Sequence, residues 1–150
     1  AVIMKRLHTQ IIWRIVIAVV ILIGILSVAI PIDRTNPPVT GTIEAPGKVM
    51  AILHRSCYDC HSNETKWPWY SYVAPASWLV GKDVQDGRKH LNFSQWDTYS
   101  EKRRRHKIKE IGEEVAEGEM PLWFYVPLHA EAGLLPADIK ILTAWSESQQ

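Results

Sequence analysis

The sequence predicts an all-α protein with an apolar N-terminal helix, a proline-rich linker and one helical domain. Three observations support this prediction. Residues 11–30 are almost entirely apolar, residues 31–47 contain four prolines, and the rest of the chain carries apolar residues at helical spacing. No segment alternates apolar and polar residues for long enough to predict a strand. At 150 residues the chain has room for one small domain plus an appendage.

The apolar segment is long enough to cross a membrane. Residues 11–30 carry a single charge, Arg14, and about 20 residues match the hydrocarbon thickness of a bilayer. A basic flank, residues 1–10, precedes the segment and predicts a signal anchor whose N-terminus is cytoplasmic. A cleaved export signal is the alternative, because residues 27–29 have the small-x-small form of a cleavage site. We therefore expect a single-pass protein of the inner (cytoplasmic) membrane, with its domain in the periplasm.

The remainder of the chain divides into a linker and a domain. Residues 31–47 predict an extended linker, because prolines and glycines interrupt every periodicity there. Residues 48–150 then form the folded domain. From residue 48 onward, 13 Lys and Arg stand against 14 Asp and Glu, so no strong positive field favours nucleic acid as a partner.

Helical periodicity predicts four helices in the domain. The first runs into the two cysteines of the chain, since Val49 and Ile52 share one face. Ser94 and Ser100 are candidate helix caps, and Gly118 is expected to end a long helix. We expect helices over residues 48–57, over 73–84 with a break at Pro75, over 101–118 and over 136–148.

Both cysteines lie in one short motif. Residues 57–61 read C-Y-D-C-H, the C-x-x-C-H pattern that is typical of covalent c-type haem attachment. Two thiols one helical turn apart add to the two vinyl groups of a haem, and the adjacent histidine binds the iron. The motif therefore predicts one haem c, held covalently through Cys57 and Cys60, with His61 as the proximal iron ligand.

The iron needs a second axial ligand, and the proximal histidine needs a partner. The other ring nitrogen of His61 should donate to a backbone carbonyl, for which Pro68 and Pro75 are candidates. Met120 is the predicted sixth ligand, because it lies in a stiff turn between a glycine and a proline. His129 in the same loop is the competing candidate.

Other chemistries of the cysteine pair fit the sequence less well. A disulfide between Cys57 and Cys60 leaves His61 unexplained, and a thioredoxin-like pair requires a βαβ context. Zinc needs four ligands, for which His54 would have to join the same turn.

Aromatic and polar residues of the domain are candidates for lining a haem. A porphyrin needs apolar walls, although core packing explains each tryptophan equally well. The candidates for ring contact are Trp67, Trp69, Trp78, Trp96 and Trp123. The candidates for a propionate are Tyr70, Arg88 and Asn92.

Four segments resemble, in order, the small bacterial haem-binding-domain family of membrane-anchored monohaem cytochromes c. They read CYDCHSNETKWPWYSYVAPASWLV, DGRKHLNFSQW, GEMPLWFYVPLH and LPADIKILTAW. The resemblance covers residues 48–147 and implies a cytochrome c-like helical fold around one haem. It places Cys57, Cys60, His61 and Met120 in the attachment and ligand positions. It also implies haem binding and, by association, electron transfer.

These observations predict an electron-transfer protein rather than an enzyme. We expect a membrane-anchored monohaem cytochrome c that carries single electrons on the periplasmic side. The expected partners are membrane lipid, other subunits of a respiratory or photosynthetic complex, and a redox donor and acceptor, with no nucleic acid. Two alternatives stay open: a haem enzyme or gas sensor with an exchangeable sixth ligand, and a structural haem subunit. Methionine in the sixth position favours electron transfer.

Overall fold

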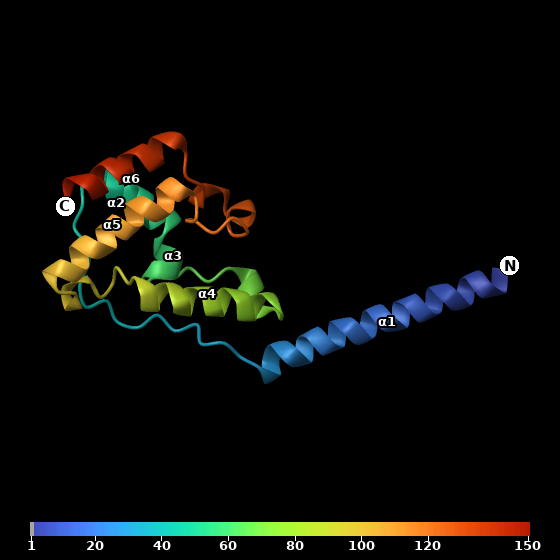
Figure 1. The fold of residues 1–150 in the computed structure, drawn as a ribbon. Coiled ribbons are helices and arrows are strands. Elements are labelled where there is room, and N and C mark those ends of the chain that lie inside the picture. The colour runs from blue at the N-terminus through green and yellow to red at the C-terminus, as the bar shows by residue number, and fades with distance from the viewer. Residues whose placement is uncertain (1) are drawn as a thin grey trace. The chain divides into compact units, whose positions relative to one another are not determined.

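The computed structural model describes residues 2–150, which fold into helices and connecting loops (Figure 1). No strand is present among these residues, which confirms the all-α prediction. The helices are α1 (Val2–Ala29), α2 (Gly47–Ser56), α3 (Tyr58–His61), α4 (Ala76–His90), α5 (Glu101–Glu117) and α6 (Pro136–Ser148). Short 3-10 helices lie between them: η1 (Trp69–Tyr72), η2 (Trp96–Thr98), η3 (Val126–Leu128) and η4 (Ala130–Ala132).

The chain forms two compact units. The first unit comprises the chain up to Arg34 together with Trp67–Asp83, and the second comprises Thr35–Lys66 together with Val84–Gln150. Helix α4 begins in the first unit and ends in the second. The sequence contains no pattern that groups Trp67–Asp83 with the N-terminal helix.

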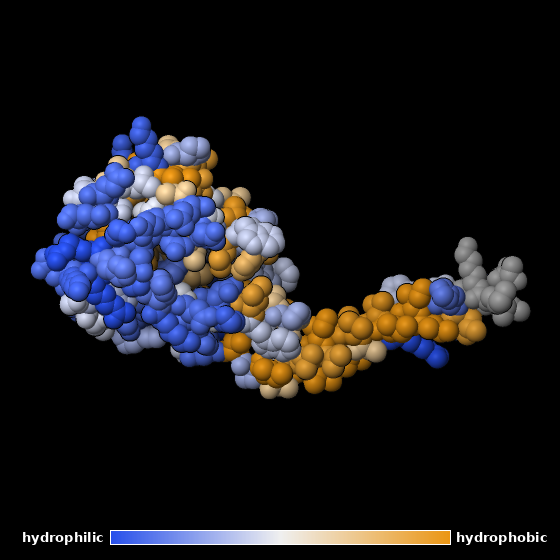
Figure 2. Space-filling view, viewed as in Figure 1, coloured by the Kyte–Doolittle hydropathy of each residue, from blue (hydrophilic) through white to orange (hydrophobic). Residues whose placement is uncertain are grey.

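Helix α1, with 28 residues, is the longest helix of the first unit. Its apolar part, Arg6–Ala29, spans 24 residues and is long and apolar enough to cross a membrane, and none of it is buried within the structure. Figure 2 shows hydrophobic side chains over nearly all of its visible surface. A helix of this length is about 36 Å long, slightly more than the roughly 30 Å of a hydrocarbon core. A signal sequence has the same length and composition.

The second unit has one hydrophobic core. Its largest fully buried side chains include Leu53 of α2, Phe93 of the loop after α4 and Leu142 of α6. Helix α6 packs against both α5 and α2 (Figure 1). Gly112 permits the close approach of α5 to α6, because a Cβ there would lie 2.4 Å from Ser146 Oγ. This core supports the short α3 turn, which carries the cysteine motif.

The caps predicted for α5 are confirmed in part. Ser100 is its N-cap and accepts a hydrogen bond from Arg103 N at 3.3 Å. Gly118 ends the helix in the left-handed conformation, with φ 78°, which glycine adopts without steric cost. Ser94 is not a cap. Its buried hydroxyl instead accepts from Asn63 N at 2.9 Å.

Both predicted ends of α4, residues 73 and 84, are wrong. Pro75 does not interrupt this helix, which begins directly after it at Ala76. A proline lacks the N–H that a helix interior requires but is tolerated at a helix start. The helix also continues beyond the predicted end to His90. Its last turn is polar and shows no apolar periodicity, so the sequence pattern ends before the helix does.

Candidate haem-binding site

The cysteine motif forms a single tight turn. Helix α2 ends at Ser56, and the chain continues as α3 after a break at Cys57. The backbone N–H groups of Cys60 and His61 both donate to Cys57 O, at 3.2 and 2.9 Å. Both cysteines are free thiols and partly buried. Residues three apart on a helical turn face the same side, which suits attachment to the two vinyl groups of one porphyrin.

His61 is oriented by carbonyls at the end of α4. Its Nδ1 lies 3.0 Å from Gly87 O and 3.2 Å from Leu91 O, so the Nδ1–H donates to both. Burial lowers the pKa of His61, while its hydrogen bonds to these two carbonyls act in the opposite direction. An imidazole that is neutral and carries its proton on Nδ1 presents the Nε2 lone pair, which is the form that binds a metal.

The prediction that Pro68 or Pro75 supplies the carbonyl for His61 is wrong. Both proline carbonyls accept hydrogen bonds from the backbone three residues further along the chain. The acceptors for His61 come instead from the C-terminal end of α4. Gly87 O also accepts the helical hydrogen bond from Leu91 N at 2.9 Å, so His61 shares this carbonyl, and Leu91 O lies directly after the helix.

Gly87 is a site residue that the sequence does not predict. A Cβ at this position would lie 2.6 Å from Cys60 O, a backbone atom that has little freedom to move. Glycine therefore lets the α4 backbone approach the motif closely enough for its carbonyl to reach His61. The sequence offers no signal for this role, because the helix predicted over residues 73–84 ends before Gly87.

We expect Gly87→Ala to lower both the stability of the protein and its haem content. The added methyl group would overlap Cys60 O, and overpacking of this kind costs about 1–3 kcal/mol. Denaturant unfolding and haem absorption of the purified protein measure the two effects. Gln85→Ala, at an exposed position on the same helix, is the matched control and should change neither. Wild-type values for Gly87→Ala would contradict the close packing of α4 against the motif.

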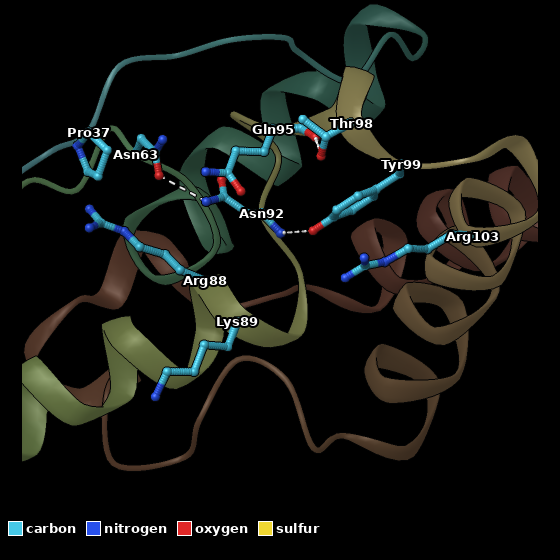
Figure 3. Close-up of a pocket in the computed structure, with 9 residues that line it drawn as sticks. All are labelled: Pro37, Asn63, Arg88, Lys89, Asn92, Gln95, Thr98, Tyr99 and Arg103. Carbon is cyan, nitrogen blue, oxygen red and sulfur yellow. Dashed lines mark hydrogen bonds between the residues drawn. The ribbon is translucent and has the colours of Figure 1, made fainter.

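A buried hydrogen-bond network holds the residues that follow the motif. Asn63 N donates to Ser94 Oγ, and Asn92 Nδ2 donates to Asn63 Oδ1, both at 2.9 Å. Asn92 N donates to Tyr99 Oη, also at 2.9 Å, as Figure 3 shows. Because these polar groups are buried and paired, the network holds the segment after the motif to the segment after α4.

The guanidinium of Arg88 donates hydrogen bonds to four other residues of the second unit. Its Nε donates to Ser62 O at 2.8 Å, and its Nη1 donates to Thr35 O at 3.0 Å. Its Nη2 donates to Asn36 Oδ1 at 2.7 Å and to Thr65 Oγ1 at 2.9 Å. A guanidinium with this many partners connects the segment before α2 and the segment after the motif to α4.

A polar pocket lies beside this network (Figure 3). It has a volume of about 380 Å³, and its lining includes Asn63, Lys89, Asn92, Tyr99 and Arg103. None of the four residues predicted to bind haem lines it. Its walls are polar, unlike the apolar surroundings that a porphyrin ring requires.

Asp59 connects the motif to the loop that carries Met120. Its Oδ2 accepts from Tyr125 Oη, and its Oδ1 accepts from Lys66 N, both at 3.0 Å. Met120 itself is half-buried, and its backbone N–H donates to Glu114 O at the end of α5 at 3.3 Å. The loop with the predicted sixth ligand is therefore held to the haem motif only five residues from that ligand.

His129, the competing sixth ligand, already makes contacts within the same loop. Its ring stacks on Tyr125 with centroids 4.1 Å apart. Its Nδ1 lies 3.4 Å from Glu131 Oε1. The Glu131 contact is made by Nδ1, and a histidine held through Nδ1 can bind a metal through Nε2. His129 and Met120 are therefore both candidates for the sixth position.

The alternatives to haem gain no support from the geometry. Burial raises the pKa of Cys57 to about 12, with the neighbouring Cys60 adding to the rise, so this thiol stays protonated. Across residues 2–150, no group of three or more His, Cys, Asp or Glu side chains is placed to hold a metal ion. His54, the further zinc ligand considered from the sequence, instead packs on Tyr58 with ring centroids 3.8 Å apart.

Two of the candidate tryptophans have clear environments in the second unit. Trp96 is 6% exposed and belongs to the hydrophobic core beside Phe93. Trp123, in the loop that also carries Met120, is 82% exposed. Core packing therefore accounts for Trp96, and Trp123 lies at the surface.

The residues of the motif fit a haem. Two thiols on one turn can hold a porphyrin, and an imidazole with an occupied Nδ1 can bind iron through Nε2. Fold and site together define an all-α haem-binding protein. A sequence profile of the haem-binding domain family matches residues 18–148, and the chain belongs to that family. No curated protein and no solved structure matches the chain.

Proposed function

We propose that the protein is a membrane-anchored monohaem c-type cytochrome that transfers single electrons. The observation that carries this proposal is the fixed imidazole of His61, placed directly beside two thiols of suitable spacing. Cys57 and Cys60 would each add S–H across one vinyl group to form a thioether, and His61 Nε2 and Met120 Sδ would bind the iron. The bound haem supplies one-electron chemistry by cycling between Fe(II) and Fe(III).

The chain contributes a rigid frame for that chemistry. The carbonyls of Gly87 and Leu91 hold the His61 ring, and the Asp59–Tyr125 hydrogen bond holds the loop of the sixth ligand. Ligands that keep their positions in both oxidation states need little reorganisation when an electron arrives or leaves. This arrangement supports a carrier over a haem enzyme or gas sensor, which needs an open or exchangeable position.

Helix α1 would anchor the protein in the inner membrane. The basic residues Arg6 and Arg14 lie in its N-terminal half, which favours a cytoplasmic N-terminus and a periplasmic haem domain. The partners of such a protein would be other subunits of a respiratory or photosynthetic complex, a redox donor and a redox acceptor.

A redox titration of the haem-loaded full chain in nanodiscs tests this function. We expect one reversible one-electron wave, a low-spin spectrum in both oxidation states and no binding of carbon monoxide by the ferrous form. A high-spin ferrous haem that binds carbon monoxide readily would contradict the electron-transfer function and would indicate a haem enzyme or gas sensor.

A further inference from the structure

Part of the first unit is hydrogen-bonded to the C-terminal end of α1. We call residues 69–79 the docking segment. The hydroxyl of Ser27, in the last turn of α1, accepts a hydrogen bond from Ala74 N at 2.9 Å. The indole Nε1 of Trp78 donates to Ile30 O, directly after the helix, at 3.1 Å. These bonds place the docking segment alongside the final turn of the apolar helix.

Arg34 extends the same attachment beyond the helix. Its Nε and Nη2 donate to Ser71 O at 2.9 and 2.6 Å. Its guanidinium carbon lies 4.3 Å from the centroid of the Tyr72 ring. Just after the docking segment, Gly81 lies so close to Ile32 that a Cβ would be 2.7 Å from Ile32 Cδ1. The last turn of α1 and the residues that follow it therefore both contact this segment or the residues just after it.

The docking segment exposes large apolar and aromatic side chains. The exposed fractions are 79% for Trp69, 55% for Tyr72, 40% for Val73 and 50% for Leu79. On α1 itself, Val28 near the helix end is 81% exposed. A cluster of this kind on a soluble protein marks a contact surface.

Several backbone N–H groups of the docking segment are already paired within the first unit. The N–H groups of residues 71, 73, 74, 77 and 78 all donate to acceptors within the first unit. Lipid provides no hydrogen-bond partners, so a segment that contacts lipid must satisfy its backbone internally. The Trp78–Ile30 bond also satisfies a carbonyl just beyond the C-terminal end of α1.

The length of α1 determines the depth of this segment in a bilayer. A hydrocarbon core of about 30 Å takes about 20 helical residues, and the apolar run of residues 11–30 supplies them. Ile30 then lies at the outer boundary of the core. Ser27 lies about 4.5 Å deeper, three residues earlier on the helix. A segment bonded to both residues lies where acyl chains meet headgroups.

We propose that the docking segment inserts its exposed side chains into the headgroup region of the outer leaflet. Trp69 and Tyr72 would be at the depth where tryptophan and tyrosine are enriched in membrane proteins. Arg34, next to Tyr72, offers a cation to lipid phosphates. This surface is a second contact with lipid, distinct from the spanning helix, and it rests on the proposed anchoring through α1.

Nitroxide labels on single introduced cysteines test the proposal in the haem-loaded full chain, in nanodiscs of phosphatidylethanolamine and phosphatidylglycerol. Tyr72→Cys and Leu79→Cys report on the docking segment. Ile21→Cys reports on the middle of α1, and Lys102→Cys on the exposed, charged start of α5. Labelling of the parent chain measures the background from its native cysteines. Power saturation with oxygen and with a soluble nickel complex gives the depth of each label.

We expect the two docking-segment labels to show less access to nickel and more access to oxygen than the Lys102 label. Their depth should be shallower than that of the Ile21 label. Nickel access equal to that at Lys102, with Ile21 in lipid, overturns the proposal and leaves the anchoring intact. Labels hidden from both reagents also overturn it, because protein then covers the segment. Nickel access at Ile21 contradicts the anchoring itself.

Discussion

Replacing His61 with alanine is expected to abolish the low-spin haem spectrum and to reduce the yield of haem-loaded protein sharply. The substitution removes the proposed proximal ligand and takes the His61 donor away from Leu91 O, while Gly87 O keeps the hydrogen bond from Leu91 N. An unpaired buried polar group costs about 1–3 kcal/mol, so stability should fall together with haem ligation. Absorption and magnetic circular dichroism spectra of the ferric and ferrous protein measure the change.

His106→Ala provides the matched histidine control. The His106 side chain is 64% exposed on α5, and its Nε2 lies 3.2 Å from Glu110 Oε1. We expect its removal to leave the haem spectrum and the haem yield unchanged. A low-spin spectrum that survives in His61→Ala, or one lost equally in both variants, would contradict the role of His61.

Replacing Met120 with alanine is expected to lower the reduction potential and to remove the weak near-infrared band of an iron–methionine bond. A soft thioether favours ferrous iron, so its loss stabilises the ferric state. The fall should be on the order of 0.1 V, within the roughly 0.8 V range that axial ligands set. A redox titration and a ferric near-infrared spectrum measure both effects. Haem attachment should persist, because Cys57, Cys60 and His61 remain.

His129→Ala separates the two candidates for the sixth position. Because His129 contacts Tyr125 and Glu131, its loss should alter the loop only locally and leave the near-infrared band in place. If the parent protein lacks the band, and His129→Ala shifts the potential while Met120→Ala does not, His129 is the ligand.

Local sequence signals predicted most of the helices. Apolar periodicity located α2, α5 and α6 to within one or two residues, and the Ser100 and Gly118 caps marked the ends of α5. The sequence pattern does not predict the start of α4 at Ala76, because a proline within an apolar-periodic segment indicates a break, although proline is also compatible with a helix start.

The partners of the site residues could not be predicted in the same way. His61 is held by backbone carbonyls of Gly87 and Leu91, and a carbonyl acceptor has no residue type that identifies it. The Asp59–Tyr125 hydrogen bond joins residues 66 positions apart, which only the tertiary fold brings together. The motif itself was visible because its chemistry depends on adjacent residues and fixed spacing.

The intact mass of the denatured full chain tests the central claim most directly. If Cys57 and Cys60 hold one haem through thioethers, the mass will exceed that of the polypeptide by one haem, and the excess will survive denaturation. The double variant Cys57→Ser with Cys60→Ser should show the mass of the polypeptide alone. A parent chain that loses its haem on denaturation, and then has the polypeptide mass, would contradict covalent c-type attachment.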